Sequence, residues 1–84
     1  MHFEIEAAAN CQTLSRLINY FAQRDLTPSF VQATHEGSSI SVTIEQPDLE
    51  LAHAMIIAEK MRASVLVERV VLKPLLENAE QGPS

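Results

Sequence analysis

Histidine and cysteine, the side chains that most often carry chemistry, are few and scattered in this sequence. His2, His35 and His53 fall in three different predicted elements, so their spacing brings no two of them together as metal ligands. Cys11 is the single cysteine. It stands at the start of a predicted helix, a setting in which thiolate nucleophiles and redox sensors occur, but no base stands beside it. We predict no metal site, surface or half-buried histidines, and an unreactive thiol.

The acidic residues show no catalytic arrangement either. Glu4 and Glu6 share the polar side of an alternating stretch, and Asp48 and Glu50 lie where a helix dipole favours negative charge. A glycosidase-type acid pair needs a cleft between two carboxylates, and a chain of 84 residues offers little cleft. Glycine-rich phosphate loops, Cys-x-x-Cys, His-Glu-x-x-His and Gly-x-Ser-x-Gly motifs are missing from the sequence. We predict a protein that is not an enzyme, has no catalytic residues and needs no cofactor.

Composition restricts the class of protein further. Eighty-four residues, 46% of them hydrophobic, are typical of one small globular domain. The formal net charge is −5 and the few basic residues are scattered, which disfavours nucleic acid and anionic membrane surfaces as partners. One cysteine allows no intramolecular disulfide, which suits a reducing compartment. With no signal peptide and no apolar run of about 20 residues, we expect a cytoplasmic protein.

The first half of the chain predicts a strand, a helix and a hairpin. Phe3, Ile5 and Ala7 alternate with glutamates, as in a half-buried strand. A helix is expected from about residue 11 to Arg24, with Asn10 as its N-cap. Its apolar face is Leu14, Leu17, Ile18 and Phe21, which recur at i, i+3, i+4 and i+7. Two β-rich runs follow, and Gly37 between them predicts an antiparallel hairpin whose second strand buries Ile40, Val42 and Ile44.

The second half predicts a helix and a last strand. The helix is expected over residues 46–62, with Pro47 near its start and Lys60 and Arg62 at its C-terminal end. Its expected apolar stripe is Leu51, Ala54, Met55, Ile57, Ala58 and Met61. The strand, within residues 64–72, is expected to place Val65, Val67 and Val71 on one face and Leu66, Val70 and Leu72 on the other. A strand that is apolar on both faces needs cover on both; the helices cover only one face of a small open sheet, so the C-terminal tail or a second subunit must cover the other.

The order of these elements is β-α-β-β-α-β, which predicts an α+β fold. This is the ferredoxin-like plan, a four-stranded antiparallel sheet with two helices on one face. We expect one domain over residues 1–73 and a C-terminal tail over residues 74–84. Leu75 and Leu76 of that tail are able to dock, and its last six or so residues are expected to be disordered.

One candidate site emerges from these elements. The loop "AANCQT" joins the first strand to the first helix, where unpaired backbone N–H groups favour an anion such as a carboxylate. The candidate ligand-binding residues are Asn10, Cys11, Gln12 and Thr13. A capped helix with no ligand is the alternative.

The stretch "QTLSRLINYFAQRDLTPSFV" resembles the start of the ACT domain in the regulatory small subunit of acetolactate synthase. The residues that match that pattern in register are Leu14, Ser15, Arg16, Leu17, Phe21 and Arg24. The resemblance implies the ferredoxin-like ACT fold, a non-catalytic regulatory role and a homodimer. It also implies an amino-acid effector, such as a branched-chain amino acid, near the loop between the first strand and the first helix. The implied partner is a separate catalytic subunit that depends on thiamine diphosphate.

The sequence departs from the family pattern around this loop. Gln12 stands where the family has a glycine that lets the ligand carboxylate approach, and Ala9 stands where it has a ligand-contacting asparagine, although Asn10 is adjacent. Asp25 replaces the glycine after the helix, and Pro28 stands where isoleucine is frequent. We predict that Gln12→Gly raises affinity for a small amino acid. The alternatives are a ligand-free dimerisation or interaction module and, last, a small enzyme of the acylphosphatase kind, whose phosphate-loop arginine is missing here.

Overall fold

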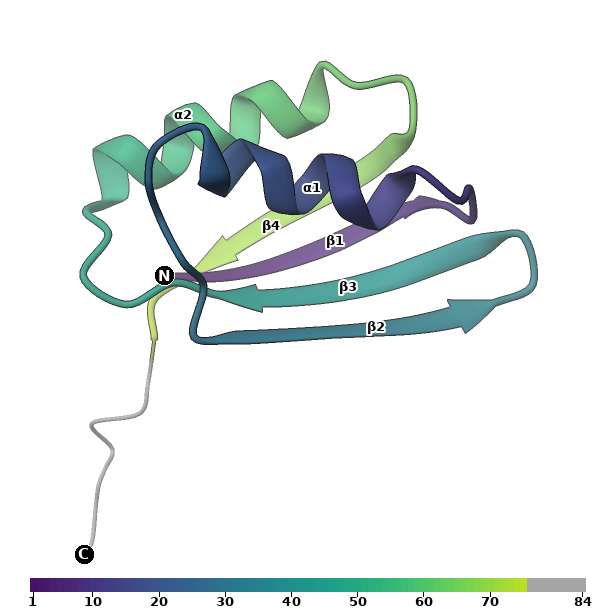
Figure 1. The fold of residues 1–84 in the computed structure, drawn as a ribbon, viewed down its shortest axis with the longest axis horizontal. Helices are drawn as coiled ribbons and strands as arrows, with labels where there is room; N and C mark the ends of the chain where they lie inside the picture. The colour runs from purple at the N-terminus through teal and green to yellow at the C-terminus, as the bar shows by residue number, and fades with distance from the viewer. Residues whose placement is uncertain (76–84) are drawn as a thin grey trace, which may run out of the picture.

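The computed structural model describes residues 1–75 and has two layers, a twisted sheet and a pair of helices on one of its faces (Figure 1). The elements, in chain order, are β1 (His2–Ala8), α1 (Thr13–Ala22), β2 (Phe30–Glu36), β3 (Ser39–Glu45), α2 (Leu51–Arg62) and β4 (Val67–Lys73). The strands lie in the order β2-β3-β1-β4 and every neighbouring pair is antiparallel. The predicted βαββαβ fold is therefore confirmed.

The core lies between the sheet and the helices. Phe3, Ile5 and Ala7 of β1 are fully buried, because the alternation predicted from the sequence turns these three side chains toward the helices. Val42 and Ile44 of β3 lie beside them in the same layer. The ring of Phe21 from α1 packs edge-on against Phe3, with the ring centroids 5.1 Å apart. This aromatic pair fixes α1 over the two central strands.

Helix α1 is shorter at both ends than the predicted range of residues 11–24. Its N-cap is Gln12, whose side chain makes no capping bond, so Asn10 is not the N-cap. At the other end Arg24 lies beyond the last helical turn. There Leu26 N–H donates to Phe21 O (3.0 Å) and Asp25 N–H donates to Ala22 O (3.0 Å). With Asp25 in the left-handed region (φ 58°), these two bonds form a Schellman closure that ends the helix before Pro28.

The predicted hairpin of β2 and β3 is confirmed. Gly37 supplies the positive φ (62°) that the connecting turn requires. Strand β3 lies inside the sheet, whereas β2 lies at its edge and all seven of its residues are exposed. Neither helix reaches over β2 (Figure 1). One side of its backbone is therefore open to hydrogen bonding.

Helix α2 begins five residues later than predicted. Pro47 and Asp48 occupy a turn in front of it, and Asp48 has a positive φ (59°) that a helix cannot contain. Lys60 and Arg62 lie in the last turn, as predicted. The residues that α2 buries are Ala54, Ile57, Ala58 and Met61. Leu51 and Met55, predicted to share that stripe, are more than half exposed, because apolar residues surround this helix and the sheet accepts only one side of it.

Strand β4 differs from the predicted strand within residues 64–72 in its start and in its faces. Val65 and Leu66 fall in the turn before it, and Val65 is almost fully exposed. An irregularity in the β1–β4 register, where Glu6 pairs with Arg69 but Ala7 pairs with Val67, brings Val67 to the helix side with Val70. The open face of β4 then carries Arg69, Val71 and Lys73. The strand is therefore not apolar on both faces.

The predicted tail falls largely outside the described residues. Leu75 is half-buried, and the expectations for Leu76 and for the last six residues concern residues 76–84, which the structure does not describe. Neither helix within residues 1–75 has the length and apolar character needed to cross a membrane.

Candidate functional site

The loop between β1 and α1 is held by a dense set of short hydrogen bonds. Asn10 supplies two of the acceptors: its side-chain oxygen receives Gln12 N–H (2.8 Å) and its carbonyl receives Thr13 N–H (3.0 Å). Ala9 N–H donates to Ser38 O (2.9 Å), which ties the loop to the β2–β3 turn. Asn10 thus acts as a local turn former rather than as a helix cap, because its side chain closes a turn on its own backbone.

Gln12 and Thr13 are both engaged within the protein. The Oε1 atom of Gln12 accepts a hydrogen bond from Arg16 Nη2 (3.1 Å), so the side chain lies along the first turn of α1. Thr13 is almost fully buried, and its hydroxyl donates to Ala8 O (2.7 Å). Thr13 therefore anchors the helix to β1. Its side chain is not available to a ligand.

A shallow cavity of about 300 Å³ opens beside this loop. Its lining residues are Ala9, Asn10, Cys11, His35 and Ile40. Two of the four predicted site residues, Asn10 and Cys11, are therefore on its wall, and Gln12 and Thr13 are not. His35 and Ile40 were not predicted as site residues. They reach the cavity because they pair with each other across the hairpin while Ile40 pairs with Ala7 of β1, a non-local register that no local motif indicates.

Backbone donors give the loop its electrostatic character. Among residues 1–75, the N–H groups of Cys11, Leu14 and Ser15 have no acceptor in the protein. Such groups at the start of a helix carry partial positive charge and favour an anion. The guanidinium group of Arg16 lies one turn away, on Gln12. These free N–H groups and the nearby guanidinium group give the loop an environment that favours an anion.

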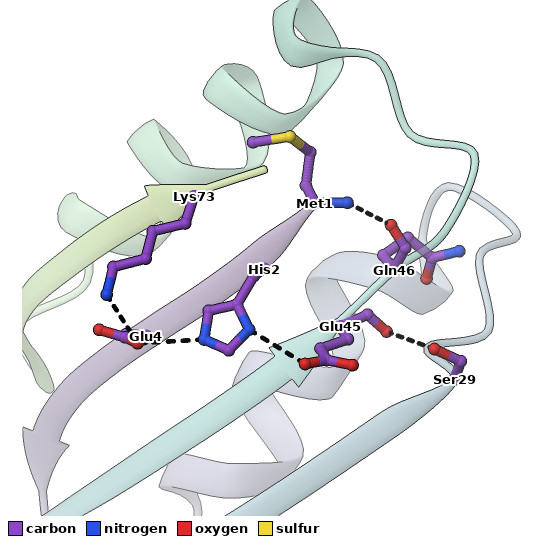
Figure 2. A network of polar contacts seen from close by, with 7 residues as sticks. All are labelled: Met1, His2, Glu4, Ser29, Glu45, Gln46 and Lys73. Carbon is purple, nitrogen blue, oxygen red and sulfur yellow. Dashed lines mark hydrogen bonds and ion pairs between the residues drawn. The ribbon is translucent and has the colours of Figure 1, made fainter. Parts of the chain in front are cut away.

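A separate polar network lies on the face of the sheet that carries no helix, near the start of β1 (Figure 2). His2 Nε2 lies 3.1 Å from Glu4 Oε2, and His2 Nδ1 lies 3.1 Å from Glu45 Oε2. Lys73 Nζ lies 3.2 Å from the same oxygen of Glu4. The hydrogen bond from Lys73, and next the one from His2, lower the pKa of Glu4 below its ordinary value of 4.5. These contacts join β1, β3 and β4 across the sheet.

This network shows no sign of a metal centre. Within residues 1–75, no three His, Cys, Asp or Glu side chains are grouped so that they could hold a metal ion. The N-terminal amine donates to Gln46 O (2.6 Å), and Gln46 N–H donates back to Met1 O (2.9 Å). The first residue thus extends the β1–β3 ladder, and the side-chain contacts of the network link three strands of the sheet.

Comparison with known families decides where the chain belongs. The family model described as an ACT-like domain matches residues 1–79. The chain belongs to the ACT-like domain family. A comparison with curated proteins finds no match. The ACT-like fold agrees with the resemblance drawn from residues 12–31, whereas nothing in the comparisons links this ACT-like domain to acetolactate synthase in particular.

The structure shows the backbone conformation at two positions where this sequence departs from the family pattern, Gln12 and Asp25. Gln12 adopts a right-handed helical backbone (φ −97°), so its position needs no glycine for conformational reasons. Asp25 does occupy a left-handed conformation, the one that glycine adopts most easily. Aspartate tolerates this region better than most residues, which explains why α1 still ends cleanly.

Proposed function

We propose that this ACT-like domain is a non-catalytic regulatory module of the cytoplasm. In this proposal it binds a small amino acid beside the β1–α1 loop and modulates a partner biosynthetic enzyme. The observation that carries the proposal is the cavity at this loop, where Asn10 and Cys11 meet His35 of the hairpin. The membership in the ACT-like family supports a regulatory role.

The cavity suits the parts of a small amino acid. The free N–H of Cys11 would receive the carboxylate, as donors at a helix start do. The side-chain oxygen of Asn10 accepts one hydrogen bond from Gln12 and retains a lone pair for the ligand amine. Ile40 and Ala9 offer apolar surface to an aliphatic side chain. A branched-chain amino acid is the effector that this arrangement and the family resemblance favour together.

We further propose that the domain acts as a homodimer joined through β2. This strand is an edge strand with every residue exposed, and such an edge is a template for pairing with another strand. His35 lies on β2, so a second copy paired along this strand would border the cavity. The effector would then stabilise the dimer and, through it, one state of the partner enzyme.

A charge at the middle of β2 tests the dimer. Ala33 is exposed at the centre of the strand, so a symmetric pairing places two copies of this residue near each other. We expect Ala33→Glu to convert the dimer to a monomer, since like charges opposite each other destabilise paired strands. Ala33→Gln, of the same size and uncharged, is the matched control. An unchanged mass of Ala33→Glu in sedimentation velocity would refute pairing through β2.

The partner enzyme is proposed from the resemblance of residues 12–31. A thiamine diphosphate-dependent synthase of the acetolactate synthase kind is the expected catalytic subunit. Affinity capture of the tagged protein from its own cells, followed by mass spectrometry, tests this point. Recovery of such a synthase supports the proposal, and recovery of the ACT-like domain alone refutes this partner.

Ligand binding is tested by thermal unfolding of the wild-type protein with valine, leucine or isoleucine. A ligand that binds only the folded state stabilises it by about 2.7 kcal/mol at a hundredfold excess over Kd. We expect Gln12→Gly to raise this affinity, because the loss of the glutamine side chain frees Arg16 for the carboxylate. Arg24→Gln, a charge change on the surface beyond α1, is the control.

One set of contacts favours a second candidate function, a ligand-free dimerisation or interaction module. Asn10 already receives Gln12 N–H, and Arg16 already binds Gln12, so the loop satisfies part of its polarity by itself. Under this alternative no amino acid changes the unfolding temperature, and Gln12→Gly has no effect on binding.

A further inference from the structure

The two edges of the sheet differ in what their backbone groups contact. Strand β2 forms one edge and β4 forms the other (Figure 1). Within residues 1–75, no side chain makes a hydrogen bond to the backbone of β2. At β4, by contrast, Arg62 of α2 donates a hydrogen bond from Nη2 to the carbonyl oxygen of Val70 (2.9 Å). A charged side chain thus occupies one backbone acceptor of β4.

The bonding pattern of β1 shows that this acceptor lies on the outer side of β4. The amine of Met1 donates to Gln46 O, and Gln46 N–H donates back to Met1 O. Because successive residues of an antiparallel strand bond to opposite neighbours, the odd-numbered residues of β1 bond to β3 and the even-numbered ones to β4. Val70 pairs with the odd-numbered Ile5. The N–H and C=O groups of Val70 therefore face away from β1, toward the edge of the sheet.

A second contact holds the guanidinium group of Arg62 at this edge. Its Nη1 atom lies 2.7 Å from Glu59 Oε2, on the preceding turn of α2. The planar guanidinium group directs several donors at once, so it binds the carboxylate of Glu59 and the carbonyl of Val70 together. Helix α2 packs against β4, which places this group where an added strand would bring its own N–H donor to Val70 O.

We propose that Arg62 blocks the β4 edge against pairing, so that β2 is the sheet edge at which a second copy of this chain can add. A strand that pairs with β4 has to displace a charged donor from Val70 O, and charged side chains at an edge strand prevent such pairing. Strand β2 carries no such obstacle. The same alternation turns the backbone groups of its residues Val31, Ala33 and His35 outward.

The blocked edge limits how far the protein can assemble, which goes beyond the proposed function and needs no effector. Two copies joined through β2 form one continuous sheet whose two outer edges are both β4. If these edges were open, further copies would add to them, because edge contacts that do not close on themselves build open arrays. With Arg62 on Val70 O at each outer edge, assembly through the sheet stops at two copies.

Sedimentation velocity of the full chain, over a wide range of concentration, tests the inference. Arg62→Ala removes both polar contacts and opens the β4 edge. We expect the mass of its largest species to be at least twice that of the wild-type protein and to rise with concentration. Lys60→Ala is the matched control, because it removes the same charge from the same helical turn but no bond to β4, and it should leave the mass unchanged.

A second variant tests the same contact without removing the arginine. Glu59→Gln takes away the carboxylate that holds the guanidinium group, at a side chain that is 70% exposed. We expect it to raise the mass in the same direction as Arg62→Ala but less. Circular dichroism shows which variants keep the wild-type fold, and Glu59→Gln decides if Arg62→Ala does not. Folded variants that sediment as the wild-type protein does at every concentration would refute the inference.

Ala33→Glu separates this inference from the proposed pairing through β2. If Arg62→Ala doubles the mass while Ala33→Glu leaves the wild-type mass unchanged, Arg62 blocks the β4 edge and pairing through β2 fails. If Ala33→Glu gives a monomer while Arg62→Ala sediments as the wild-type protein does, pairing through β2 holds and the inference about Arg62 fails. The double variant with both changes can pair only through β4, so we expect it to form a dimer.

Discussion

Helices α1 and α2 cover the same face of the same sheet, yet they use their apolar residues differently. α1 buries Leu17 and Phe21 and presents polar residues outward, among them Arg16 and Asn19. α2 buries four residues, two of which are alanines, and leaves three large side chains, Leu51, Met55 and Ile56, in contact with water. In α1 the core accounts for the apolar residues. In α2 the core accounts for only four of the eight apolar residues.

This difference separates two reasons for a residue to be hydrophobic. A buried side chain on α1 or on the inner side of α2 stabilises the isolated chain, since it is removed from water on folding. An exposed apolar side chain on the outer side of α2 contributes little to that stability. It is removed from water, with the favourable free energy that this brings, only when another surface covers it. Substitutions on the two sides of α2 should therefore change different quantities.

Neighbouring isoleucines in α2 give the largest expected contrast. Ile57 is fully buried and Ile56 is 44% exposed. We expect Ile57→Ala to reduce the free energy of unfolding by about 2–5 kcal/mol. Ile56→Ala should cost less than about 1 kcal/mol in the monomer, because it leaves no internal cavity. Urea unfolding at low protein concentration measures both. Equal losses at the two positions would contradict the two-sided description of α2.

The end of α1 gives a smaller effect of the opposite sign. Asp25 lies in the left-handed region, where a side chain costs about 1–2 kcal/mol. Asp25→Gly removes that strain at an entropic cost of about 0.5–1 kcal/mol. We expect a net gain of about 0.5–1 kcal/mol in the free energy of unfolding, the difference between these two ranges. Asp25→Ala keeps the strain and should lower stability. A loss with glycine would show that the aspartate side chain itself stabilises the helix end.

The polar network on the open face of the sheet gives the smallest effect, and it depends on pH. Because Lys73 and His2 lower the pKa of Glu4, this carboxylate stabilises the folded state above the ordinary value of 4.5. Its contribution is lost as the pH falls through the lower pKa of the folded state. Glu4→Gln should therefore flatten the fall in stability below pH 4.5. Glu68→Gln, the same change at an exposed residue of β4, is the matched control. Identical acid profiles for the two variants would contradict this role of Glu4.

The sequence predicted those features that depend on local patterns. Alternation placed Phe3, Ile5 and Ala7 in the core, helical spacing identified the buried face of α1, and Gly37 marked the hairpin turn. The inner face of α2 was predicted too broadly: its four buried residues were all expected, but Leu51 and Met55 were expected with them, because apolar residues surround that helix and its pattern has no single direction. The face of Val67 was missed because a register irregularity follows from pairing with β1 and leaves no local signal.

The candidate site also contains residues that a local pattern indicates and residues that only the pairing of strands brings to it. Asn10 and Cys11, which line the cavity, were predicted as site residues because a loop that enters a helix has recognisable donors and turn formers. His35 and Ile40 reach the same cavity only through the pairing of three strands, so no spacing along the chain reveals them. Gln12 was predicted to face the ligand, but a bond to Arg16, four residues later on the same helix, holds it along α1.

A titration of the isotopically labelled protein with valine, leucine and isoleucine, followed by nuclear magnetic resonance, tests the central proposal most directly. An effector bound beside the β1–α1 loop should shift the backbone amide signals of Ala9, Asn10, Cys11 and His35 in a saturable manner. The amides of Leu51 and Met55, on the outer side of α2, should move less. If none of the standard amino acids shifts the loop signals, the domain does not bind an amino acid there, and the ligand-free module replaces the proposed function.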